Sequence, residues 1–182
     1  MSTKKSYHKE NLRRDLLDAG RDYVRANGHI GLSIRTLAQQ VGVSPGAPYH
    51  HFPDRRSFLL ALAVESFTEM MAETQNVVAG PLTPAEKLRA MGIQFVRFSE
   101  ENPHLVDLMY ESELTTPSVD PELVAFQNEA HLTLRQIIVD ALPGLTDREY
   151  DLRVIAYWSA IYGFASMRKK GVIHPDQKAL PE

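Results

Sequence analysis

Start and stop signals for helices recur along this chain of 182 residues, whereas alternating strand patterns are nearly absent. Thr83–Glu86 and Thr146–Glu149 each have threonine at a helix N-cap and glutamate three residues later, which is the capping-box pattern. Asn102-Pro103 and Asp120-Pro121 each place an N-cap before a proline at the first helical position, where the missing N–H is harmless. These signals predict an all-α protein with eight or nine helices.

Apolar residues recur at spacings of three and four within each predicted helix. Ser33 is expected to cap the second helix, and Gly42 to supply the left-handed residue that ends it. Residues 1–10 should form a flexible basic arm, residues 115–118 a mobile linker, and the tail after Gly171 a frayed end. We expect helices over residues 11–26, 34–41, 46–51, 55–78, 84–101, 103–111, 121–142 and 147–170.

Charge is distributed unevenly along the chain. The 20 Lys and Arg against 23 Asp and Glu give a net charge of −3, which alone argues against a polyanionic partner. Residues 1–56, however, hold ten Lys and Arg against five acids, a net of +5, so the other 126 residues carry −8. Such asymmetry favours a nucleic-acid-facing module attached to an acidic body, although a run of charge can also be a solvated face.

The chain contains no cysteine, which excludes disulfides and thiolate chemistry and indicates a reducing compartment. No stretch approaches 18 consecutive apolar residues, and no apolar core follows the charged N-terminus. We therefore expect a cytoplasmic protein with neither a signal peptide nor a membrane partner.

Two short predicted helices are joined by Gly42-Val43-Ser44, the sequence pattern of a helix-turn-helix. Each has about two turns, so neither is stable unless it packs on longer helices. We expect Leu37, Ala38, Val43 and Phe52 in the core of this element.

The run from Leu32 to Arg56 closely resembles the N-terminal DNA-binding domain of TetR-family transcriptional regulators. The shared pattern is a glycine after helix one, an alanine in helix two, a Gly-Val-Ser turn, and then Tyr49 and Phe52. The resemblance covers about residues 10–65. It implies a three-helix DNA-binding domain over residues 1–56, a connecting helix over 54–79, and an effector-binding and dimerisation domain over 57–182.

The resemblance also implies which residues meet DNA. Arg35 is the candidate for a bidentate contact to guanine, the Ala47 methyl suits a thymine methyl, and Arg55 takes the position of a phosphate-binding lysine. Pro48 departs from the family pattern and fits only if its helix begins no earlier than Gly46. The full set of candidate DNA-contacting residues is Ser33, Arg35, Ser44, Gly46, Ala47, Tyr49, His50 and Arg55.

Large apolar and aromatic side chains recur beyond residue 80. Such a set forms either an ordinary hydrophobic core or the lining of a ligand pocket. In the TetR family this region forms an effector pocket and a dimer interface. Residues 157–163 resemble a subgroup with Trp followed by His-Gly, with Tyr162 in place of that histidine. Helices 121–142 and 147–170 are the expected dimer pair, with Leu132, Ile138 and Ile155 as plausible contacts, although leucine and isoleucine at these positions fit intramolecular packing equally well. The candidate pocket residues are Met91, Phe95, Phe98, Leu108, Met109, Phe126, Trp158 and Tyr162.

The sequence thus predicts a homodimeric, ligand-responsive transcriptional regulator without enzyme activity, cofactor or metal. It is expected to be a repressor, released from a palindromic double-stranded DNA operator by an apolar or aromatic small-molecule effector. Two alternatives stay open. One is a helical adaptor that binds protein through its aromatic face, and the other is a small metal-dependent enzyme using His104, Asp107 and Glu111.

Overall fold

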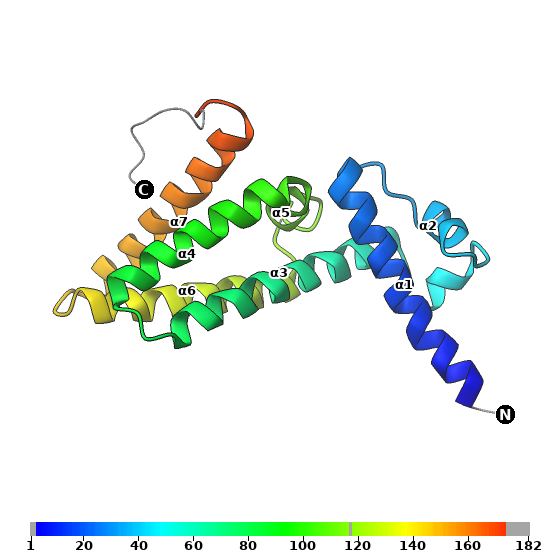
Figure 1. Ribbon diagram of the computed structural model, residues 1–182, viewed down its shortest axis with the longest axis horizontal. Coiled ribbons are helices and arrows are strands. Elements are labelled where there is room, and N and C mark those ends of the chain that lie inside the picture. Colours follow the sequence, from blue (N-terminus) through cyan, green and yellow to red (C-terminus); the bar gives the residue numbers. More distant parts are fainter. Residues whose placement is uncertain (1–2, 117, 174–182) are drawn as a thin grey trace. The chain divides into compact units, whose positions relative to one another are not determined.

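The computed structural model describes residues 3–116 and 118–173, and within these ranges every regular element is a helix (Figure 1). The all-α prediction is confirmed. The predicted number of eight or nine helices is slightly too high, because the third expected helix is a single 3-10 turn. The elements are α1 (Thr3–Asn27), α2 (Ile34–Gln40), η1 (Ala47–His50), α3 (Arg55–Ala79), α4 (Pro84–Glu101), α5 (Pro103–Tyr110), α6 (Pro121–Ala141) and α7 (Asp147–Lys169).

The expected flexible arm at the N-terminus and the expected frayed tail at the C-terminus have different outcomes. Helix α1 begins at Thr3, so the flexible arm expected over residues 1–10 is wrong from that residue onward. The stretch 3–10 contains neither Gly nor Pro, so nothing in it stops the helix. The frayed tail expected after Gly171 lies outside the described residues from position 174 onward.

Both predicted capping boxes are present. The Oγ1 atoms of Thr83 and Thr146 accept the N–H groups of Glu86 and Glu149, and each glutamate carboxylate accepts the threonine N–H at 2.8 Å. These hydrogen bonds lower the pKa of both glutamates. The starts of α4 and α7 are therefore fixed by local chemistry.

Replacing Thr83 by alanine is expected to lower the free energy of unfolding by about 1 kcal/mol, because the first turn of α4 loses its side-chain acceptor. Urea denaturation followed by circular dichroism measures the change. Thr83→Ser keeps the hydroxyl and should unfold near the wild-type midpoint. An alanine variant as stable as the serine variant would show that the box contributes nothing.

The chain forms two compact units. The first comprises residues 1–67 and 104–123, and the second comprises residues 68–103 and 124–182. Helix α3 contributes to both units. The functional division at residues 56 and 57, with its connecting helix over 54–79, stays a prediction.

A glycine contact between α1 and α3 organises the core of the first unit. Phe58 is fully buried, and its ring meets the edge of Phe52 with centroids 4.8 Å apart. A Cβ at Gly20 would lie 2.5 Å from Phe58 Cζ, so only glycine leaves space for this ring. The phenylalanine on α3 thereby connects α1 with the end of the short-helix region at Phe52.

The core of the second unit is built by α4, α6 and α7. Its buried members are Met91, Leu134, Ile137, Ile138, Tyr150 and Val154. Ile138 is only 3% exposed and packs in this core, so of its two expected places the intramolecular one is correct and the dimer contact is wrong. Helices α4 and α7 lie side by side (Figure 1), and the Tyr157 hydroxyl donates to the Leu88 carbonyl at 2.8 Å. None of the described helices combines the length and apolar character needed to cross a membrane.

Candidate nucleic-acid interface and effector site

Helix α2 is short and strongly two-sided. Ser33 caps it as predicted, with its Oγ accepting the Thr36 N–H. Ile34, Leu37 and Ala38 are buried beneath it. The opposite side is an exposed polar face formed by Arg35, Thr36, Gln39 and Gln40.

The turn after α2 has the glycine geometry that the sequence predicted. Gly42 has a φ of 78°, and its N–H bonds to the Gln39 carbonyl while the Val43 N–H bonds to the Ala38 carbonyl. This pair of bonds is the Schellman motif, which closes a helix with a left-handed residue. Leu37, Ala38 and Phe52 are buried as expected, whereas Val43 is only half-buried.

The next element, η1, begins at Ala47, so Pro48 lies at its start, where the sequence required it. The Pro48 side chain is buried, and its carbonyl accepts the N–H groups of His51 and Phe52, both at 2.9 Å. Tyr49 is 43% exposed and His50 is exposed beside it. The element is therefore one turn anchored by proline, with its tyrosine and histidine directed outward.

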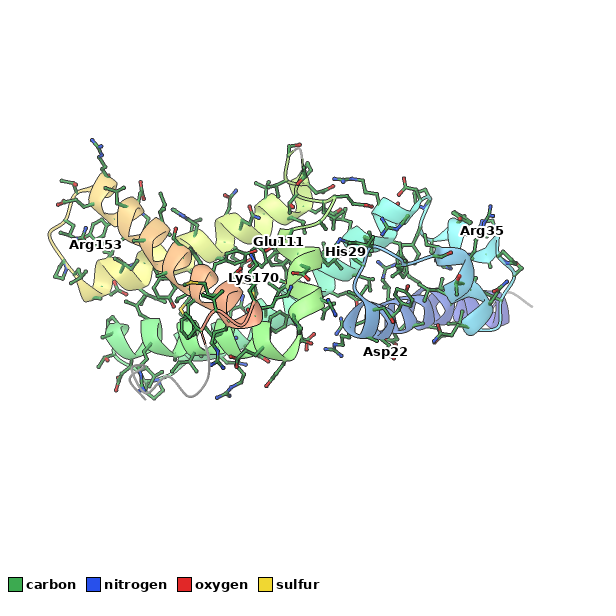
Figure 2. The ribbon with its side chains drawn as sticks, turned by 90° about the horizontal axis from the view of Figure 1, so that it is seen from above. Asp22, His29, Arg35, Glu111, Arg153 and Lys170 are labelled. Carbon is green, nitrogen blue, oxygen red and sulfur yellow. The ribbon has the colours of Figure 1, made fainter. Side chains whose placement is uncertain are left out.

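Seven of the eight predicted DNA-contacting residues lie on or beside this exposed surface. They are Ser33, Arg35, Ser44, Gly46, Ala47, Tyr49 and His50. Arg35, labelled in Figure 2, has no ion pair or hydrogen bond within the part of the chain that the structure describes. Thr36, Gln39 and Gln40 were missed, although the helical periodicity of α2 places them on the same face as Arg35.

Arg55, the eighth predicted residue, points into the first unit. Its guanidinium donates to the carbonyls of His29, Ile30 and Leu32 and pairs with Glu113. The loop residue His29, labelled in Figure 2, is half-buried, and burial followed by the Arg55 charge lowers its pKa. The structure thus occupies the Arg55 donors within the first unit.

The net charge of the first compact unit differs from the net charge counted over residues 1–56. The first unit adds to residues 1–56 two stretches without Lys or Arg that carry six acids, which turns the local +5 into −1. Several of these acids pair with arginines of the N-terminal stretch, as in Arg21–Glu65 at 3.0 Å and Arg56–Asp120 at 3.0 Å. Within α2 and η1, Arg35 is a cationic side chain that none of these acids pairs with in the described part of the chain.

The proposed metal ligands do not form a cluster. His104 Nδ1 lies 3.7 Å from Asp107 Oδ2, an ordinary pair one helical turn apart. Across residues 3–116 and 118–173, no three His, Cys, Asp or Glu side chains gather closely enough to hold a metal ion. The geometry of α5 gives the metal-enzyme alternative no support.

The structure brings together part of the predicted effector pocket. Phe95 lies edge-to-face on Trp158, with centroids 5.7 Å apart, and 6.4 Å from the ring of Tyr162. Met91 and Phe98 are buried on the same helix as Phe95, and Phe126 is half-buried. Leu108 and Met109 belong to the first unit, where both are fully buried.

A groove of about 680 Å³ lies on another side of α4 and α7. None of the eight predicted pocket residues lines it. Its floor includes Gly92, where a Cβ would lie 2.8 Å from Ile161 Cδ1, so glycine permits the close approach of the two helices.

Gln94 is a polar residue that the sequence analysis missed. Its Nε2 donates to the Met70 carbonyl at 3.3 Å and to Glu73 at 3.1 Å. Both partners are acceptors, which fixes the orientation of the amide. Its Oε1 is buried without a partner in the described part of the chain. Such an orphaned acceptor is costly unless a donor meets it.

Comparisons with known proteins agree with this architecture. Residues 88–180 match the family described as tetracyclin repressor-like, C-terminal domain, and residues 16–62 match the bacterial regulatory proteins of the tetR family. A solved structure from Rhodococcus sp. RHA1, of a protein with unknown function, is 27% identical, with a TM-score of 0.78 and coverage of 93% of this chain and 87% of that one. A transcriptional regulator of the TetR/AcrR family from Thermobifida fusca shares the fold at 18% identity, with a TM-score of 0.69 and coverage of 92% and 88%.

Among curated proteins, the chain is 34% identical over 89 residues to the HTH-type transcriptional repressor AcnR of Corynebacterium glutamicum. That match covers 46% of this chain and 47% of the repressor. Matches to AcnR of two other Corynebacterium species cover 30% and 34% of those proteins. The matched stretch thus spans less than half the length of these relatives. The two family matches, one of them covering half of the chain, together with the shared fold, show that the chain belongs to the TetR family.

Proposed function

We propose that the protein is a homodimeric, ligand-responsive transcriptional regulator that binds double-stranded DNA and acts in the cytoplasm as a repressor. The observation that carries the proposal is the exposed surface of α2 and η1, two elements in contact, which presents Arg35 on α2 and Tyr49 and His50 on η1. Guanidinium, phenol and imidazole groups on a short two-helix element suit base edges and phosphate oxygens. The name of AcnR as a repressor supports the direction of control.

The dimer is proposed to form through an exposed apolar stripe on α6 and α7. Leu132, Leu152 and Ile155 are 64%, 55% and 59% exposed. Asp151 pairs with Arg135 at 3.1 Å and with His131 at 4.0 Å, which brings these stretches of the two helices next to each other. Large apolar side chains that share an exposed face commonly mark an interface. A two-fold dimer would present two copies of α2 and η1 to successive turns of a palindromic operator.

The effector is proposed to bind on the aromatic side of α4. Phe95, Trp158 and Tyr162 supply flat apolar surface there. Gln94 Oε1 is an unsatisfied acceptor on the same helix. The aromatic rings favour an apolar or aromatic molecule, and the Gln94 acceptor would add a hydrogen bond only to a molecule that also reaches the α3 side of α4.

Substituting Tyr49 and Arg35 separately tests the proposal. Tyr49→Ala should weaken binding to operator and random DNA alike, because a phosphate contact carries no sequence information. Arg35→Ala should relax base preference at one operator position by about 1–3 kcal/mol. The operator is first selected from a random DNA pool, and both variants are then titrated at several salt concentrations.

Thr68→Ala, on α3 in the second unit, is a control expected to bind DNA like the wild type. Unchanged affinity of Tyr49→Ala at low salt would contradict the proposed docking surface. Failure of the wild type to retain any DNA would instead favour the adaptor alternative, in which the aromatic face binds protein.

A further inference from the structure

Arg55 uses its planar side chain as an internal clamp. Nη2 donates to the carbonyls of His29 at 2.5 Å and Ile30 at 3.1 Å, and Nε donates to the Leu32 carbonyl at 3.2 Å. Nη1 pairs with a Glu113 carboxylate oxygen at 2.7 Å. All three nitrogens of the guanidinium are therefore engaged, and its side chain is only one-third exposed.

The carbonyls that Arg55 binds belong to the loop between α1 and α2. Leu32, the last of these residues, is buried and directly precedes Ser33, the N-cap of α2. Fixing this loop fixes the position at which α2 begins. It consequently fixes the direction in which Arg35, in the first turn of α2, meets solvent.

The other side of the clamp is the segment that follows α5. Arg56 donates to the Glu113 backbone carbonyl and pairs with Asp120 at 3.0 Å. Leu114 between them is fully buried, and the Asp120 N–H returns to the Leu114 carbonyl at 2.8 Å. Two neighbouring arginines thus hold this segment, and Glu113 neutralises the charge of Arg55 where it binds the loop.

We propose that Arg55 is a positioning residue that holds the α1–α2 loop for DNA docking, with Glu113 as its anchor, and that it makes no phosphate contact. This inference rests on the proposed function and replaces the phosphate-binding role that the family resemblance implies for position 55. Arginine is required because one planar group reaches three carbonyls and a carboxylate in a fixed arrangement, whereas a lysine ammonium has only three donors on one atom.

The first arm of the test keeps the charge and changes the shape. Arg55→Lys should bind operator at least about tenfold more weakly, with an unchanged slope of log affinity against log salt. In the free protein, amide hydrogen exchange at residues 29–33 should accelerate. A phosphate contact predicts the opposite pattern, in which Arg55→Lys binds like the wild type while Arg55→Ala makes the salt dependence shallower by about 0.9.

The second arm removes the anchor. Glu113→Gln deletes a negative charge, which by long-range electrostatics alone would tighten DNA binding. The clamp predicts weaker operator binding and faster exchange at residues 29–33. Glu122→Gln makes the same charge change in the same unit, in the first turn of α6, and should show neither effect. Tighter binding by Glu113→Gln, or equal exchange in all variants, would overturn the inference.

These readouts separate the inference from the proposed function. Hydrogen exchange in the free protein reports on the clamp even if the wild type binds no DNA, which would refute only the proposed function. If Arg55→Lys fails to fold by circular dichroism, Glu113→Gln decides the matter, because it leaves the three carbonyl contacts in place.

Discussion

Ile155→Glu is expected to convert the protein from a dimer to a monomer and to lower its operator affinity by at least about a hundredfold. Ile155 is 59% exposed beside Leu152 on α7, so the substitution barely disturbs the fold of one chain. In a dimer, however, it would bury two carboxylates against apolar side chains, a cost of several kcal/mol. Because a monomer engages only one half-site, DNA affinity should fall with dimer content.

Sedimentation and operator titration on the same samples measure both effects. Leu82→Glu places the same charge on an exposed aliphatic side chain elsewhere, in the loop before α4, and should leave a dimer with wild-type affinity. Near-native circular dichroism of Ile155→Glu is required for the comparison. A dimeric Ile155→Glu protein would show that this stripe is not the interface.

Local chemistry explains why so many helix boundaries could be predicted. Thr83, Thr146 and Ser33 each bond to a backbone N–H only three residues away. Gly42 adopts the left-handed conformation that its position at a helix end requires. Such interactions depend on a few neighbouring residues, so the sequence contains all the information they need.

Long-range packing explains what could not be predicted. Ile138 and Ile155 look alike in the sequence, yet one is buried in the second unit and the other is exposed. Arg55 points inward to the carbonyls of residues 29, 30 and 32 and to Glu113, which is 58 residues away. The charge asymmetry of residues 1–56 likewise changes when acids from the stretch after α5 join the same unit. A linear count cannot anticipate which distant segments will fold together.

The same contrast between local and long-range information holds for the exposed surface of α2 and η1 and for Gln94 on α4. Arg35 and Tyr49 were predicted to meet DNA from the family resemblance, and both are exposed in the structure. Gln94 was missed, since an amide on an amphipathic helix reads as an ordinary polar residue. Only the positions of Met70 and Glu73, one helix away, reveal that its oxygen is left without a donor.

Phe58→Ala should be the most destabilising single change, lowering the free energy of unfolding by about 3–5 kcal/mol. The ring is fully buried, and it contacts both Phe52 and the backbone at Gly20. Its loss removes the packing that connects α3 to α1 and to the end of η1. We expect DNA binding to fall with the folded fraction, as measured by urea denaturation and operator titration at the same temperature.

Gly20→Ala fills the same contact from the other side and should destabilise by about 1–3 kcal/mol, because its methyl would lie 2.5 Å from the Phe58 ring. The two substitutions are therefore coupled. In the double variant the alanine methyl enters the space that the ring has left, so the total loss should be smaller than the sum of the single losses.

Gly46→Ala, at a glycine with nothing within 4 Å of its added Cβ, should show no coupling to Phe58→Ala. Strict additivity of Gly20→Ala and Phe58→Ala would mean that this contact does not hold α1 against α3. Coupling confined to Gly20 would identify the Gly20–Phe58 contact as packing that holds α1 against α3.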